Sequence, residues 1–155
     1  MKTCCFLGHR TINESVELIT EVANTIEMLI VDKGVDTFLF GSKSRFNDLC
    51  YELVSEMKSR YPHIKRIYVR AEFPIIDESY RSYLLERYED TYFPEKLLLA
   101  GKAVYVQRNF EMIEKSHYCL VYYDKAYIPQ ERKSGTKIAL DYAMKKKTEI
   151  ILFPG

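Results

Sequence analysis

The sequence has 155 residues, of which 47% are hydrophobic and 14% aromatic, which is enough for one sizeable core. We therefore expect a single domain over residues 1–155. Lys and Arg number 23 and Asp and Glu number 22, so the chain has no strong overall field to attract nucleic acid or an anionic membrane. Neither is expected as a partner, and any anion site has to be local.

The four cysteines lie inside hydrophobic runs, and neither they nor the three histidines show the spacing of metal ligands. We expect reduced core thiols, no disulfide framework, no metal site and no cofactor. The N-terminal segment has too few consecutive apolar residues for a signal peptide or a membrane span, which predicts a cytoplasmic protein.

Short apolar runs predict five strands, at residues 3–7, 37–40, 66–69, 118–122 and 149–153. These runs are continuous rather than alternating, as is typical of a parallel sheet that helices cover on both faces. Helical patterns lie between the runs. The sequence thus predicts an α/β fold, with a Rossmann-like, doubly wound, mostly parallel five-stranded sheet and helices on both faces.

Capping residues set the expected ends of the helices. Thr11 and Glu14 are spaced as a capping box before the first helix, which Gly34 ends. Ser44 is expected to cap a second helix over residues 45–60. Residues 74–100 are longer than an ordinary connection, so we interpret them as a functional insertion with one or two short helices.

Ligands of doubly wound sheets bind at the carboxyl ends of the strands. Gly8, His9 and Arg10 follow the first predicted strand, where they could clamp an anion or form a tight turn with a solvated arginine. Gly41 and Ser42 follow the second predicted strand, at the start of a helix. They could form an anion site at the helix N-terminus, or they could only form the turn that leads into the helix.

The remaining strand ends offer further candidates. Asp48, one turn into the second helix, could reach a ribose hydroxyl or stay solvated. Arg70 and Glu72 follow the third strand, where they could contact a ligand or pair with each other. Tyr123 could stack on a base, and the neighbouring Asp124 could accept hydrogen bonds from that base.

A helix start near the C-terminus gives the strongest single signal. Ser134, Gly135 and Thr136 provide backbone amides and two hydroxyl groups, and the glycine lets a ligand come close to the backbone. This combination suits a phosphate group, although an ordinary Ser or Thr cap has the same composition.

Four segments together resemble the SLOG superfamily: "CCFLGHR", "FLFGSKSRFNDLCYELV", the pair Arg108 and Asn109, and "SGTKIALDYA". This superfamily includes lonely-guy-type nucleotide hydrolases and DNA processing protein A, and the chain is similar to its small YpsA-like branch. The resemblance implies a Rossmann-like fold, a tendency to form a homo-oligomer, and a nucleotide-derived ligand such as an NAD-derived cyclic nucleotide. The pocket candidates that it implies are Gly8, Arg10, Gly41, Ser42, Asp48, Arg108, Asn109, Ser134, Gly135 and Thr136.

The chain departs from the hydrolases of that superfamily at one position. Their "PGGxGTxxE" motif ends in a glutamate that assists cleavage, and Ala139 stands there in this sequence. We therefore expect a non-catalytic binder of a nucleotide or nucleotide-derived signal, acting as a sensor or a sequestering protein. The alternative is a phosphoribohydrolase of nucleoside 5′-monophosphates, or an NAD-like glycohydrolase, that uses Glu72 or Asp124 as its carboxylate.

Two further possibilities remain open. The segment "KSRYPHIKRIYVR" interleaves cations with tyrosines, as single-stranded DNA binding requires, and DNA processing protein A offers an analogy. The aromatic residues of the insertion could pack on a partner copy, close over the pocket, or cover the edge of their own sheet. These residues are Phe73, Tyr80, Tyr83, Tyr88, Tyr92 and Phe93.

Overall fold

The structure is a computed structural model that describes residues 1–95, 101, 103–124 and 135–154. Strands and helices alternate along this part of the chain. In order, the elements are β1 (Thr3–Gly8), α1 (Val16–Lys33), β2 (Thr37–Phe40), α2 (Arg45–Met57), β3 (Lys65–Val69), α3 (Glu78–Leu85), β4 (Asp90–Tyr92), α4 (Ala103–Lys115), β5 (Tyr118–Tyr122), α5 (Gly135–Lys145) and β6 (Glu149–Phe153).

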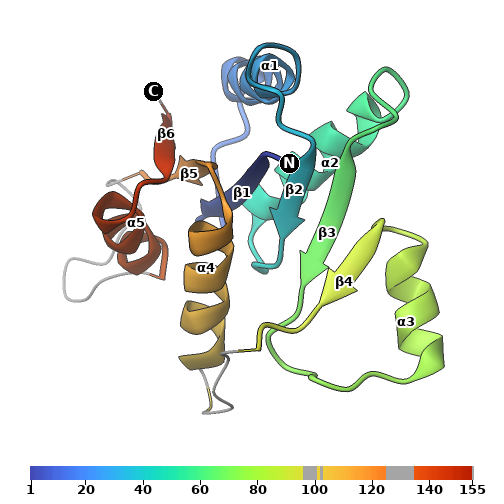
Figure 1. Ribbon diagram of the computed structural model, residues 1–155. Coiled ribbons are helices and arrows are strands. Elements are labelled where there is room, and N and C mark those ends of the chain that lie inside the picture. The colour runs from blue at the N-terminus through green and yellow to red at the C-terminus, as the bar shows by residue number, and fades with distance from the viewer. Residues whose placement is uncertain (96–100, 102, 125–134, 155) are drawn as a thin grey trace.

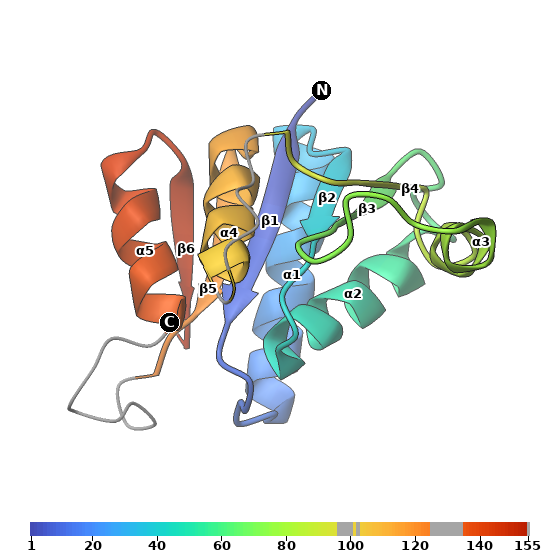
Figure 2. The same cartoon turned by 90° about the horizontal axis from the view of Figure 1, so that it is seen from below.

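The strands form one parallel sheet in the order β4-β3-β2-β1-β5-β6. The chain builds the sheet outward from β1 in one direction and later adds β5 and β6 on the other side, so the order reverses between β1 and β5. Right-handed connections then place α1 and α2 on one face and α4 and α5 on the other (Figures 1 and 2). The predicted α/β, Rossmann-like, doubly wound sheet with helices on both faces is confirmed.

The predicted number of five strands is wrong, because the sheet has six. The additional strand is β4, which pairs with β3 through Ile67 opposite Asp90 and Val69 opposite Tyr92. Its three residues, Asp-Thr-Tyr, contain no apolar run. A strand at the edge of a sheet can form without an apolar run when it is not buried on both faces. The sequence of β4 therefore did not predict a strand.

A separate hydrophobic core covers each face of the sheet. Cys4 and Phe6 of β1 belong to the core on the side of α1 and α2, whereas Cys5 and Leu7 belong to the core on the side of α4 and α5. Alternate residues of a strand point to opposite faces, so two cores require apolar residues at every position. All four cysteines are buried free thiols. No helix in the described part of the chain is long and apolar enough to cross a membrane.

The first helix begins later than the capping signal predicted. Ser15 is the N-cap, and its hydroxyl accepts a hydrogen bond of 3.1 Å from the Leu18 amide. The predicted capping box of Thr11 and Glu14 is wrong, because Glu14 instead forms a two-pronged ion pair with Arg45, at 2.7 and 2.8 Å. The ion pair with Arg45 thus takes the place of the local contact that Glu14 would make in a capping box.

Other predicted ends agree with the structure. Gly34 ends α1 in a left-handed conformation with φ of 70°, and Ser44 caps α2 by accepting a hydrogen bond from the Asn47 amide. The second helix ends at Met57, three residues before the predicted end.

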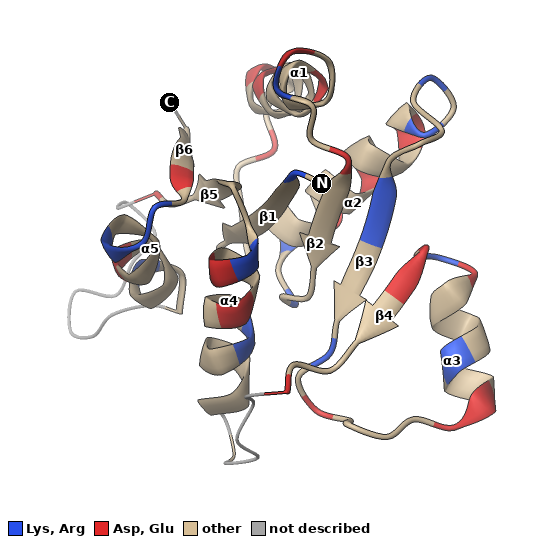
Figure 3. Ribbon diagram, in the orientation of Figure 1, with Lys and Arg blue, Asp and Glu red and all other residues tan. Residues whose placement is uncertain are grey.

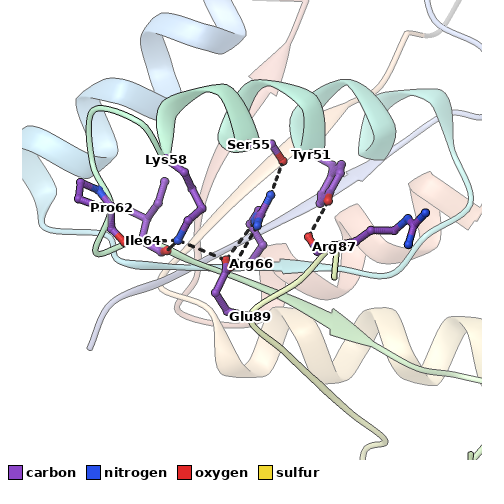
Figure 4. Close-up of polar contacts among 8 residues, drawn as sticks. All are labelled: Tyr51, Ser55, Lys58, Pro62, Ile64, Arg66, Arg87 and Glu89. Carbon is purple, nitrogen blue, oxygen red and sulfur yellow. Dashed lines mark hydrogen bonds and ion pairs between the residues drawn. The ribbon is translucent and has the colours of Figure 1, made fainter. Parts of the chain in front are cut away.

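Polar contacts attach the inserted segment to the body of the fold (Figure 4). The Arg66 guanidinium donates to both carboxylate oxygens of Glu89, at 3.0 and 2.7 Å, and also to the Ser55 hydroxyl. The Tyr51 hydroxyl of α2 donates to the Arg87 carbonyl at 2.6 Å. The helix α3 and the strand β4 are thus fixed to α2 and β3. Residues 96–100, the remainder of the predicted insertion, lie outside the described residues.

The aromatic residues predicted for the insertion differ in burial, as Tyr88, Phe73 and Tyr83 show. Tyr88 packs against Tyr51 and Tyr68, with ring centroids 5.0 and 5.3 Å apart. Tyr88 therefore packs on its own domain, next to the core on the side of α1 and α2. Phe73 and Tyr83 instead keep about half of their surface exposed, at 52% and 50%.

Candidate functional site

A cavity of about 540 Å³ lies at the carboxyl ends of the strands, next to the point where the strand order reverses. In open α/β sheets this is the place where ligands bind. Four segments form the walls: the end of β1 with its following loop, the loop after β2, one side of α4, and the first turns of α5. The described residues that line the cavity are Leu7, Gly8, His9, Arg10, Ser42, Lys43, Ser44, Tyr105, Arg108, Asn109, Gly135, Thr136 and Ala139.

Gly8 lets α2 start directly against the end of β1. A Cβ atom at this position would lie 2.5 Å from Cβ of Phe46, a distance that real side chains do not reach. The two loops are also joined by their backbones, because the Arg45 amide donates to the Arg10 carbonyl at 3.1 Å. The loops after β1 and β2 therefore meet at the cavity.

Gly41, in the loop after β2, leaves room for the side chain of Arg108 from α4. A Cβ atom here would lie 2.8 Å from Cδ of Arg108 and 2.9 Å from the Val69 carbonyl oxygen. The Gly41 amide donates to Oδ1 of Asn47 at 3.3 Å, so it is already engaged within the protein. The structure gives this glycine a steric role, with the chain and Arg108 packed closely against it.

Arg108 is a buried cation in the wall of the cavity, with only 3% of its surface exposed. Its Nε donates to Oδ1 of Asn109 at 3.3 Å, and its guanidinium carbon lies 5.7 Å from the centre of the Tyr105 ring. Burial lowers the pKa of Arg108, but arginine stays charged at neutral pH. In the part of the chain that the structure describes, no carboxylate forms an ion pair with it.

The cavity is positively charged. Arg10, Lys43 and Arg108 line it, and none of the described lining residues is an aspartate or glutamate. Elsewhere the two signs of charge are interspersed along most helices (Figure 3). Gly135 and Thr136 add the beginning of α5, where the first amides lack partners within the helix and the dipole favours anions. The local charge therefore suits an anionic ligand.

His9 is held by the end of the neighbouring strand. The Asp124 amide donates to Nε2 of His9 at 3.0 Å, and the rings of Tyr122 and Tyr123 lie 5.9 and 5.5 Å from the imidazole. Burial lowers the pKa of His9, which leaves the ring neutral at neutral pH. Tyr123 thus supports His9 and is not among the residues that line the cavity.

Two smaller hollows adjoin the main cavity. One, of about 420 Å³, contains Gly41 and Asp48 together with Tyr68 and Tyr88. The other, of about 90 Å³, contains Arg70 and Glu72 and shares Lys43, Tyr105 and Arg108 with the main cavity.

Arg70 and Glu72 do not form the ion pair that the sequence left open. Lys43 pairs with Glu72 at 3.4 Å, and the Tyr105 hydroxyl donates a short hydrogen bond to the same carboxylate. The hydrogen bond from Tyr105 is the main cause that lowers the pKa of Glu72, and Lys43 adds to the effect.

Most of the residues predicted for the site come together. The main cavity gathers eight of them: Gly8, His9, Arg10, Ser42, Arg108, Asn109, Gly135 and Thr136. Gly41, Asp48 and Arg70 lie in the two adjoining hollows, and Ser134 lies outside the described residues.

Lys43 and Tyr105 line the main cavity but were not among the residues predicted for the site. Lys43 follows Ser42 in the same loop. Tyr105 stands three positions before Arg108, and residues at this spacing share one face of a helix. The spacing was therefore a usable signal for Tyr105 once Arg108 had been chosen.

Neither a group of metal ligands nor a carboxylate lines the main cavity in the part of the chain that the structure describes. Among the residues that the structure describes, no three His, Cys, Asp or Glu side chains are grouped closely enough to hold a metal ion. Ala139, which stands where the hydrolases of the resembled superfamily carry glutamate, is buried and lines the main cavity. The methyl group at this position can contribute to shape but not to proton transfer.

A scan against protein-family models and a search of curated proteins both give no match for this chain. Among solved structures, the fold matches that of DNA processing protein A from Helicobacter pylori, a structure described for its mode of single-stranded DNA binding. The TM-score is 0.62 at 15% sequence identity. The match covers 99% of this chain but 66% of the other, so this chain spans about two thirds of that neighbour's length.

This match corrects one expectation drawn from the near-neutral charge. Nucleic acid was not expected as a partner, yet a protein with a similar fold, DNA processing protein A, is described as binding single-stranded DNA. Net charge is therefore no ground for excluding nucleic acid with this fold. At 15% identity the likeness shows a common Rossmann-like architecture, and membership of the SLOG superfamily stays a prediction.

Proposed function

We propose that this protein binds the phosphate group of a nucleotide or nucleotide-derived signal in the main cavity, without converting it. The observation that carries this proposal is the position of the cavity at the reversal of strand order, with three cations and no carboxylate among its described lining residues. The volume of about 540 Å³ lies within the range of small-molecule sites and exceeds what a phosphate group alone requires.

The geometry suggests a division of roles within the site. Arg108 is fixed by burial and by its packing against Gly41, so it can present its guanidinium to a phosphate with little loss of side-chain entropy. Thr136 supplies a buried hydroxyl group beside the first amides of α5. Arg10, which is exposed, can approach the phosphate from the solvent side.

A binding role fits the site better than hydrolysis of a glycosidic bond. That reaction requires carboxylates placed for acid and base or charge-stabilising work. Ala139 provides none, and Glu72 in the adjoining hollow is engaged by Lys43 and Tyr105. A protein that retains its ligand in this way serves as a sensor or as a sequestering protein.

Titration calorimetry with AMP and with NAD tests the proposal. We expect saturable binding of at least one of these probes, and Arg108→Gln should weaken it by about tenfold or more through loss of a charge-assisted hydrogen bond. Arg87→Gln is the matched control, because Arg87 is exposed and lies outside the three hollows. Chromatography of the same mixtures should show no released base or nicotinamide.

Two results would contradict the proposal. If Arg108→Gln and Arg87→Gln bound the probe with the same affinity as the unchanged protein, the ligand would not occupy this cavity. Release of free base that Glu72→Gln abolished would favour the hydrolase instead.

Single-stranded DNA binding is a second candidate, favoured by the structural match to DNA processing protein A. The three hollows adjoin one another: the first and second share Arg10 and Ser42, and the first and third share Arg108. Both cations and tyrosines line these hollows, and this is the combination that single-stranded DNA binding uses. Fluorescence anisotropy with a labelled oligothymidine tests it. Binding that Arg10→Gln weakens supports a DNA path along this rim, and undetectable binding at low salt excludes it.

A further inference from the structure

The smallest hollow lies at the carboxyl end of β3 and contains a second buried cation. Arg70 is the residue directly after β3, and only 9% of its surface is exposed. Within the described residues its Nε has no hydrogen-bond partner. Its Nη2 reaches the Pro74 carbonyl at 3.5 Å, which is at the outer limit of a hydrogen bond.

A buried and incompletely bonded guanidinium is costly for a folded protein. Removing a charge from water is compensated only when a counter-charge and hydrogen bonds replace the lost hydration. Burial lowers the pKa of Arg70, and the like charge of Arg81 adds to this effect, whereas the negative charge of Asp90 acts in the opposite direction without offsetting it. Arg70 therefore has the properties of a group whose partner is a ligand.

Among the described residues that line the same hollow, Glu72 is the only carboxylate, and it already has partners. Glu72 is paired with Lys43 and hydrogen-bonded by Tyr105, and its remaining charge acts on Arg108 rather than on Arg70. Both arginines line this hollow of about 90 Å³. The space between them is suited to a small anionic group rather than to a nucleoside.

The hollow is continuous with the main cavity. Lys43, Tyr105 and Arg108 line both spaces, so a single ligand can reach from one to the other past the guanidinium of Arg108. A ligand that spans them would place one anionic group near α5 and a second one near Arg70.

We propose that the hollow at the end of β3 is a second phosphate subsite, which binds a further phosphoryl group of the ligand held in the main cavity. This inference rests on the proposed function, since it extends the same site. It assigns the ligand to molecules with two linked phosphates, joined either as a pyrophosphate or through a phosphodiester in a short strand.

Two pairs of probes test the subsite by calorimetry. AMP and ADP differ by a pyrophosphate-linked phosphoryl group, whereas dAMP and the 5′-phosphorylated dinucleotide pdApdA differ by a phosphodiester-linked nucleotide. We expect the second phosphate of at least one pair to tighten binding by about tenfold. Arg70→Gln should remove this gain while leaving the affinity for the monophosphate within about twofold.

Arg81→Gln is the matched control, because it removes the same charge beside Arg70 from an exposed position that does not line the hollow. This control should retain the gain. Arg70→Lys keeps the charge but not the planar fork, so it should retain only part of the gain, and it replaces Arg70→Gln if that variant does not fold. A gain with ADP alone indicates a pyrophosphate ligand, and a gain with pdApdA alone indicates a strand.

The outcomes separate this inference from the proposed function. If monophosphate binding depends on Arg108 but a second phosphate adds nothing, or if Arg70→Gln retains the gain, the subsite is overturned and the proposed function stands. If none of the four probes binds to the unchanged protein, both are overturned.

Discussion

At the scale of single residues, the site depends on small side chains that let large ones approach. Arg108 can lie in the cavity wall because Gly41 has no Cβ atom, which would otherwise come within 2.9 Å of both the arginine and a backbone carbonyl. The sequence placed both residues in the site but not in contact. Their contact joins β2 to α4 across the sheet, and no local pattern encodes a distance between residues so far apart in the chain.

Gly41→Ala tests this contact. The added methyl group has to displace Arg108 or shift the backbone at Val69, so we expect a loss of about 1 to 3 kcal/mol in the free energy of unfolding and weaker nucleotide binding. Urea denaturation measures the first effect. Gly135→Ala is the control, because its Cβ atom would meet nothing within 4 Å, and equal destabilisation by both substitutions would contradict the packing argument.

At the scale of elements, the sequence predicted what apolar runs encode and missed what tertiary contacts decide. The strands β1, β2, β3, β5 and β6 were found because cores on both faces of the sheet leave a short continuous apolar run in each of them. The short strand β4 was missed, because it is held at the sheet edge by polar contacts. The start of α1 was misplaced because Glu14 pairs with Arg45, 31 positions away, rather than with the local backbone.

The contacts of Glu89 predict a pH dependence for the attachment of α3 and β4. Burial alone would raise the pKa of Glu89, but hydrogen bonds and charge from Arg66, with Lys58 nearby, outweigh it and lower the pKa. A carboxyl group with a lowered pKa stabilises the fold above its ordinary pKa, and this contribution is lost as the pH falls through the lowered value.

Glu89→Gln should therefore cost on the order of 1 kcal/mol at neutral pH and flatten the loss of stability between about pH 5 and pH 3. Urea denaturation across this range measures both effects. Glu86→Gln makes the same change of charge at a side chain that is 76% exposed, and it should leave the profile unchanged. A Glu89→Gln profile that keeps the steep acid limb of the unchanged protein would show that the pair does not fix the insertion.

At the scale of the whole molecule, a net charge of +1 conceals a strongly uneven local distribution. Lys and Arg are balanced by acidic residues over most helices, whereas the main cavity gathers three cations with no acid among its described residues. This difference explains why composition alone was no ground for excluding nucleic acid. The composition gives the net charge of the chain, but the position of the charged residues depends on which strand ends the fold brings together.

The local charge also sets the expected salt dependence if single-stranded DNA binds. With three cations in the main cavity, a plot of log affinity against log salt concentration should have a slope of roughly −2, at about −0.7 per phosphate. Anisotropy titrations over a series of salt concentrations give this slope. A value several times steeper would place the DNA on a larger basic surface than this cavity.

The central claim is that the cavity recognises a phosphate group, and a comparison of AMP with adenosine by titration calorimetry tests it most directly. The two probes share base and ribose, so the difference in affinity isolates the phosphate. We predict that the unchanged protein binds AMP at least about tenfold more tightly than adenosine and that Arg108→Gln reduces this ratio towards one. Equal affinities of the unchanged protein for AMP and adenosine would contradict the claim.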